Sequence, residues 1–224
     1  MTPTILPILS LLETRVLGVL VEKKHTVPDT YPLTLNALVA GCNQKTSRDP
    51  IVNATDAEVQ ATIDQLKTLS LVVETSGGRV MRYAHNVDRV LGVPSQAVAL
   101  LAALMLRGPQ TVGELRINTE RLHHFADTSA VEGFLDELAA RPAGALVAEL
   151  ARQPGARETR WMHLLSGAPS ADAMRPPLES EADYVAVSEL AALKANVAKL
   201  QEQVAALQST VTRLCTELGT TPNP

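Results

Sequence analysis

The chain has few aromatic side chains and few cysteines. Aromatics make up 3% of its 224 residues, so its cores must be built from leucine, valine and alanine. The two cysteines, Cys42 and Cys215, lie far apart and belong to no CxxC or similar paired motif. A disulfide framework is therefore not expected, and a reduced cytoplasmic protein is the natural interpretation.

Long apolar runs are also missing. The longest one, Ala97–Leu106, is too short to span a bilayer and is typical of a buried helix. The N-terminal sequence MTPTILPILSLLE lacks a basic segment and a small-residue cleavage site, so no signal peptide is expected. Both observations favour a cytoplasmic location.

The chain has no excess of positive charge. Its formal net charge is -4, made up of 0 for residues 1–90, -1 for residues 91–166 and -3 for the remainder. This is not the charge pattern of a strongly basic nucleic-acid binder. Motifs of common enzymes are absent too, since no GxGxxG, Walker A, GxSxG or HExxH sequence occurs. We therefore expect no catalytic residues, no cofactor and no metal.

The histidines and cysteines support that expectation. His123 and His124 are adjacent, so on a helix they would point about 100° apart and could not share a metal unaided. Cys42 falls on the apolar stripe of a predicted helix, which indicates a core residue rather than a nucleophile.

What the sequence does contain is one pattern that occurs twice: short amphipathic helices followed by a two-stranded hairpin. In the first copy, apolar spacing predicts a helix from about Ser10 to Lys24 and a second helix capped by Thr34. Thr55 and Glu58 form a capping box for a third helix. Two β-prone segments, 71–75 and 80–85, flank a Gly-Gly turn. Three helices and a hairpin predict a winged-helix domain over residues 1–90.

The connection between the second and third helices of this domain, residues 43–54, is long and polar. Long loops in compact domains are often functional. The alternative is an ordered loop in which Asn43, Arg48 and Asp49 satisfy one another and the backbone.

The sequence LETRVLGVLVEKKHTVPDTYPLTLNAL, continuing through CNQKTSRDPIV, closely resembles the YceH family of bacterial proteins. The resemblance is dense over about residues 12–52 and extends more loosely through most of the chain. It implies a tandem winged-helix fold and supplies no catalytic residues.

The second copy predicts a winged-helix domain over residues 91–166. Its first helix begins at Pro94-Ser95 and stops at Gly108-Pro109, and capping boxes at Thr111–Glu114 and Ser129–Glu132 open two more. The helix that opens at Thr111 is expected to run through Leu122. A hairpin is expected from segments 145–150 and 160–165, with Trp161 packed between hairpin and helix.

The C-terminal part predicts a linker over residues 167–186 and a coiled-coil helix over residues 187–218. The apolar residues of this helix follow a heptad repeat, abcdefg. Valine at most a positions and leucine at the d positions favour a parallel homodimer. The alternative is a single helix that folds back onto a winged-helix domain. The predicted seam is Leu190, Leu193, Val197, Leu200, Val204, Leu207, Val211, Leu214 and Leu218.

The fold class expected is therefore mainly α with small β-wings: two tandem winged helices followed by a coiled coil. Winged helices often place their third helix in the DNA major groove. Here both third helices carry a net charge of -2, which opposes phosphate binding. Contacts to double-stranded DNA, or to a protein partner, are thus expected from hairpins and loops, unless these side chains are merely solvated or paired. The candidates are Asn43, Gln44, Lys45, Arg48, Arg79, Arg82, Arg116, Arg121, Arg152, Arg157 and Arg160.

Two functions remain open from the sequence. The first is a dimeric, non-catalytic DNA-associated transcriptional regulator or nucleoid-associated factor. The second is a protein–protein adaptor that uses winged-helix surfaces and does not bind DNA. Fold alone cannot choose between them.

Overall fold

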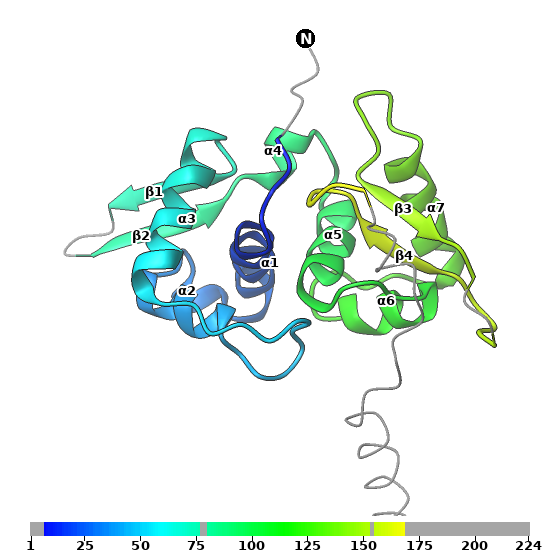
Figure 1. Cartoon of the computed structure of the whole chain (residues 1–224), viewed down its shortest axis with the longest axis horizontal. Coiled ribbons are helices and arrows are strands. Elements are labelled where there is room, and N and C mark those ends of the chain that lie inside the picture. The colour runs from blue at the N-terminus through cyan, green and yellow to red at the C-terminus, as the bar shows by residue number, and fades with distance from the viewer. Residues whose placement is uncertain (1–6, 77–79, 153–154, 169–224) are drawn as a thin grey trace, which may run out of the picture. The chain divides into compact units, whose positions relative to one another are not determined.

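The computed structural model describes residues 7–76, 80–152 and 155–168. These residues form seven α-helices, one short 3₁₀ helix and two antiparallel two-stranded sheets (Figure 1). In chain order they are α1 Leu11–Thr26, η1 Pro28–Thr30, α2 Leu35–Cys42, α3 Asp56–Thr68, β1 Val72–Ser76, β2 Met81–His85, α4 Val87–Leu91, α5 Ser95–Arg107, α6 Val112–Thr119, α7 Thr128–Ala139, β3 Val147–Leu150 and β4 Arg160–His163.

The expected duplication of local structure is present. Helices α1 to α3 and the β1–β2 hairpin form a first half, and α5 to α7 with β3–β4 form a second half of the same order. In each half, the residue shortly before the second helix pairs with the second hairpin strand. Leu33 and Tyr83 exchange backbone hydrogen bonds of 3.0 and 2.8 Å, and Gln110 and Trp161 exchange bonds of 3.0 and 2.7 Å. The two halves therefore share details of pairing as well as element order.

Capping side chains fix most helix starts where the sequence predicts them. Thr34 accepts a hydrogen bond from the backbone of α2, and complete capping boxes open α3 at Thr55 and α6 at Thr111. Two expectations were wrong in detail. Helix α7 is capped by Asp127, whose carboxylate accepts from the Ala130 amide, and so begins before the expected box. Helix α6 ends at Thr119 rather than continuing through residue 122.

Both hairpins have the predicted strands. The first pairs Val72 with His85 at one end and Ser76 with Met81 at the other. The second pairs Val147 with His163 and Leu150 with Arg160. The predicted turn glycines at 77 and 78 lie outside the described residues, as does Pro154 of the second turn.

Helices α1 and α5 lie side by side between the two halves (Figure 1). Their contact is close because Gly18 faces α5: a Cβ atom there would lie 2.8 Å from Cγ of Leu106. The buried apolar cluster runs through both halves without interruption. Division into separate domains at residues 90 and 91 stays a prediction, and the expected coiled coil falls outside the described residues.

None of the helices described between residues 7 and 168 is long and apolar enough to cross a membrane.

Candidate interaction surfaces

The loop of residues 43–54 is held closed by its own polar side chains. The Asn43 amide binds Ala54 in both directions: its Nδ2 donates to the Ala54 carbonyl and its Oδ1 accepts from the Ala54 amide, both at 2.8 Å. Asn43 therefore joins the two ends of the loop, and its hydrogen-bonding capacity is used internally.

Arg48, in the middle of this loop, points inward. It is only 7% exposed, and its guanidinium donates to both carboxylate oxygens of Glu22 on α1, at 3.1 and 2.6 Å. It also donates to the Gly41 carbonyl and to Oε1 of Gln44. Burial alone would raise the pKa of Glu22, but the hydrogen bonds and charge of Arg48 outweigh it and the pKa is lowered. Two sequence candidates, Arg48 and Gln44, are thus engaged within the protein.

The same loop also contacts the second half. The Asp49 amide donates to the Leu106 carbonyl at 2.8 Å, and Arg107 donates to Oγ of Ser47 at 2.7 Å. On the other side, Arg15 of α1 donates to the Pro50 carbonyl at 2.6 Å. The loop therefore ties α1 to the end of α5, which supports its interpretation as an ordered structural segment.

The other candidate cations divide into two groups. Arg82 donates to the carbonyls of Thr30 and Pro32, while Arg116 donates to a backbone carbonyl and Arg160 lies 3.6 Å from Glu114. Four candidates are exposed and have no such bond among the described residues: Lys45, Arg121, Arg152 and Arg157. Arg79 lies outside the described residues.

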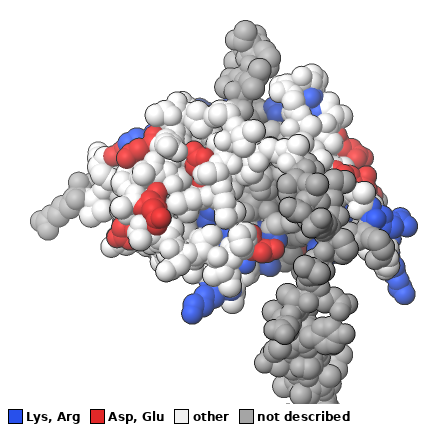
Figure 2. Space-filling view, in the orientation of Figure 1, with Lys and Arg blue, Asp and Glu red and all other residues white. Residues whose placement is uncertain are grey.

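The outer faces of α3 and α7 are acidic. On α3, Asp56, Glu58 and Asp64 are exposed, whereas Lys67 is paired with Glu74 of β1. On α7 the exposed charged side chains are Glu132, Asp136 and Glu137. Figure 2 shows carboxylates over both regions, with Lys and Arg instead over the 43–54 loop and the far end of the second hairpin. The exposed carboxylates of α3 and α7 therefore lie away from the exposed candidate cations, although ion pairs such as Lys67–Glu74 occur between oppositely charged side chains.

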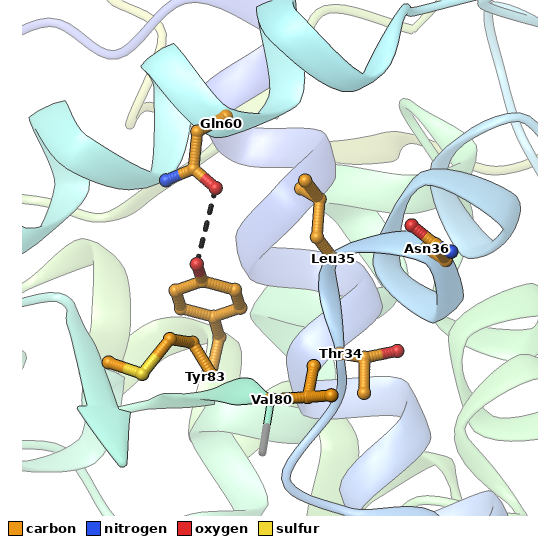
Figure 3. A pocket seen from close by; sticks show the side chains of 7 residues that line it. Thr34, Leu35, Asn36, Gln60, Val80 and Tyr83 are labelled. Carbon is orange, nitrogen blue, oxygen red and sulfur yellow. Dashed lines mark hydrogen bonds between the residues drawn. The ribbon is translucent and has the colours of Figure 1, made fainter. Parts of the chain in front are cut away.

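A pocket of ≈ 320 Å³ opens beside α3 in the first half. Its lining comes from the start of α2, the middle of α3 and the second hairpin strand with the residue before it. Figure 3 shows Gln60 reaching from α3 toward Tyr83, whose hydroxyl donates to its Oε1 at 3.2 Å. The full lining is Thr34, Leu35, Asn36, Gln60, Val80, Met81 and Tyr83. Val80 and Met81 are 55% and 44% exposed, so apolar surface is open to solvent here.

Sequence reasoning did not find this pocket. Its lining residues come from three segments of the chain, and no sequence motif includes more than one of these segments. The available signal in the sequence was that two adjacent residues after the predicted turn, Val80 and Met81, are both apolar, whereas successive residues of a strand face opposite sides.

Two half-buried histidines occupy equivalent positions at the ends of β2 and β4. His85 pairs with Val72 and His163 pairs with Val147, each at the first position of the opposing strand. Burial lowers the pKa of each imidazole to about 4. Nδ1 of both rings, and Nε2 of His85, are buried atoms without a hydrogen-bond partner among the described residues. Both rings are therefore neutral near pH 7.

Cys42 lies in the core, as its place on the apolar stripe predicts. It is 0% exposed, and burial raises the pKa of its thiol to about 12. Because only the thiolate reacts, the folded protein should protect this thiol.

In a Cys215→Ser variant, we expect iodoacetamide to label Cys42 at least about 100-fold more slowly in buffer than in denaturant. Similar rates, measured by mass spectrometry, would contradict this burial.

No group of three or more His, Cys, Asp or Glu side chains that could hold a metal ion occurs among the residues that the structure describes.

Comparison with known proteins identifies the family. Residues 9–156 match the family model described as "Protein of unknown function, DUF480". A UPF0502 protein of Burkholderia ambifaria (strain MC40-6) is 59% identical over 219 residues, covering 97% of this chain and 92% of the relative. A UPF0502 protein of Methylibium petroleiphilum is 60% identical over 199 residues, covering 89% and 85%. The chain therefore belongs to the DUF480, or UPF0502, family of uncharacterised bacterial proteins.

Proposed function

We propose that this protein is a non-catalytic, tandem winged-helix adaptor of the cytoplasm that binds another protein through the outer face of α3 and its neighbouring pocket. The helix order in each half, followed by a hairpin, supports the winged-helix interpretation. The repeated bridges, Leu33–Tyr83 and Gln110–Trp161, support it further. The heptads of residues 190–218 would double the surface by forming a homodimer.

One observation carries the choice of a protein partner: the helices that would enter the major groove present carboxylates. A DNA-binding winged helix uses its third helix for base contacts, and most affinity comes from neutralising phosphates. Asp56, Glu58 and Asp64 would instead repel phosphates, while Lys67 is occupied by Glu74. Protein partners have no such requirement for cations.

Two of the arginines that the sequence offers for DNA contacts are bonded within the protein, which also favours a protein partner. Arg48 is buried against Glu22, and Arg82 is bonded to two backbone carbonyls. Freeing Arg48 for DNA would break both of its hydrogen bonds to the Glu22 carboxylate, which would keep only Lys23 as a cationic neighbour, at a cost of about 2–4 kcal/mol. These arginines serve the fold.

DNA association remains the second candidate because of the second hairpin. Arg152, Arg157 and Arg160 are exposed there, and Lys45 is exposed on the 43–54 loop. Such a set would contact phosphates without reading sequence.

Site-specific photo-crosslinking tests the adaptor. A photo-reactive amino acid is placed in the full-length chain at Ala61, which is exposed on α3, and as a control at Ala143, which is exposed after α7. We expect a discrete protein adduct in bacterial cells from position 61 alone, and its loss with Asp64→Lys. A nuclease-sensitive adduct, or no adduct from position 61, would contradict the proposal.

A further inference from the structure

We infer that the pocket beside α3 binds a basic amphipathic helix, with one aliphatic side chain in the pocket and a lysine or arginine one turn to each side. This inference rests on the proposed adaptor function and specifies the chemistry of its partner. The surface combines an open apolar depression with carboxylates at defined spacing.

The apolar part of the site is suited to a single anchor. Leu35, Met81 and the ring of Tyr83 line it, and its volume of ≈ 320 Å³ accommodates an aliphatic side chain. Tyr83 is only 5% exposed and donates a hydrogen bond to Gln60, so its ring forms a wall that is held by contacts within the protein (Figure 3). Removal of the exposed Met81 side chain from water would add apolar burial on binding.

The charged part follows from helical spacing. Gln60 lines the pocket, and Asp56 and Asp64 lie four residues before and after it on the same face of α3. The rise per residue places each carboxylate about 6 Å along the helix from the pocket. A partner helix with an apolar residue at i and cations at i−4 and i+4 has the same spacing.

Nearby cations leave this acidic character in place. Lys67 lies 3.8 Å from Asp64 but is also paired with Glu74, and Asp56 has no ion-pair partner among the described residues. Arg82, on the neighbouring strand, is directed to the carbonyls of Thr30 and Pro32. Charge complementarity therefore selects a basic partner. The acidic C-terminal part of this chain, with a net charge of -3 over residues 167–224, does not fit.

The test uses the full-length protein and three synthetic helical peptides. The first has a central leucine flanked by lysine at i−4 and i+4, the second replaces both lysines with glutamate, and the third replaces the leucine with serine. Affinity is measured by fluorescence anisotropy at low salt, and the binding position by methyl and amide NMR shifts.

We expect the leucine–lysine peptide to bind and to shift the Met81 methyl and Gln60 side-chain signals. Because exposed ion pairs contribute modestly, Asp56→Asn with Asp64→Asn should weaken binding about threefold to tenfold. Met81→Gln should weaken it as well. Ile117→Gln, at a residue that is 72% exposed on α6, is the matched control and should change nothing.

Equal binding of the lysine and glutamate peptides, shifts elsewhere on the surface, or no binding up to millimolar peptide would overturn the inference. If position 61 still crosslinks to a protein in that case, the adaptor function stands and only the proposed partner chemistry fails. If neither is observed, both fail.

Discussion

Replacing Arg48 with alanine will lower the free energy of unfolding by about 2–4 kcal/mol. The substitution removes both hydrogen bonds to Glu22 and leaves that carboxylate, whose side chain is only 18% exposed, with Lys23 as its remaining cationic neighbour at 3.1 Å. It also removes the hydrogen bonds that Arg48 donates to the Gly41 carbonyl and to Oε1 of Gln44. Urea denaturation measures the change directly.

A matched control lies in the same loop. Lys45 is exposed and has no hydrogen bond among the described residues, so Lys45→Ala should change the free energy of unfolding by less than about 0.5 kcal/mol. Replacing Glu22 and Arg48 together by apolar residues should cost less than Arg48→Ala alone. Equal effects of Arg48→Ala and Lys45→Ala would show that this arginine is not part of the fold.

Acidification should destabilise the protein by about 2 kcal/mol for each of the half-buried His85 and His163 between pH 7 and pH 5. Burial lowers the pKa of His85 and of His163 to about 4, below the ordinary value of 6.5. The unfolded chain therefore binds more protons than the folded chain between pH 6.5 and pH 4. Stability is full above that range and is lost as the pH falls through it.

The charges around the two rings leave this direction unchanged. Beside the dominant burial, Lys24 and His25 lower the pKa of His85 further and Asp88 raises it, while burial alone acts on His163. The His85→Leu, His163→Leu double variant should therefore lose most of the pH dependence of unfolding between pH 7 and pH 5. His124→Leu, at an exposed ring, should keep it. If the free energy of unfolding of the double variant still fell as steeply between pH 7 and pH 5, the claim that both folded-state rings are neutral would be contradicted.

The sequence predicts most helix starts because their signals are local. A capping box needs two side chains three residues apart, and Thr55–Glu58 and Thr111–Glu114 form the predicted bonds. Spacing alone was misleading at Ser129, because Asp127, two residues earlier, accepts a hydrogen bond from the Ala130 amide and caps the helix instead. Helix α4 was not predicted, since its five residues are too few for apolar periodicity and it has no side-chain cap.

The candidate surfaces were harder to predict because their partners are distant in sequence. Arg48 in a polar loop looks available for DNA, and only its contact with Glu22, 26 residues away, shows that it is buried. The pocket beside α3 combines three separate segments, so no single pattern indicates it. The acidic faces of α3 and α7, by contrast, were evident from composition, because exposed positions of an amphipathic helix can be read from its apolar stripe.

Titration of the full-length protein with a mixed-sequence DNA duplex, at salt concentrations from about 20 to 200 mM, tests the central claim most directly. If α3 and α7 are acidic surfaces for protein partners, affinity will be no better than weak at low salt. Arg152→Glu with Arg157→Glu would then make little difference. Tight binding whose affinity falls steeply with salt, and is lost in that variant, would contradict the adaptor and identify a DNA-binding protein instead.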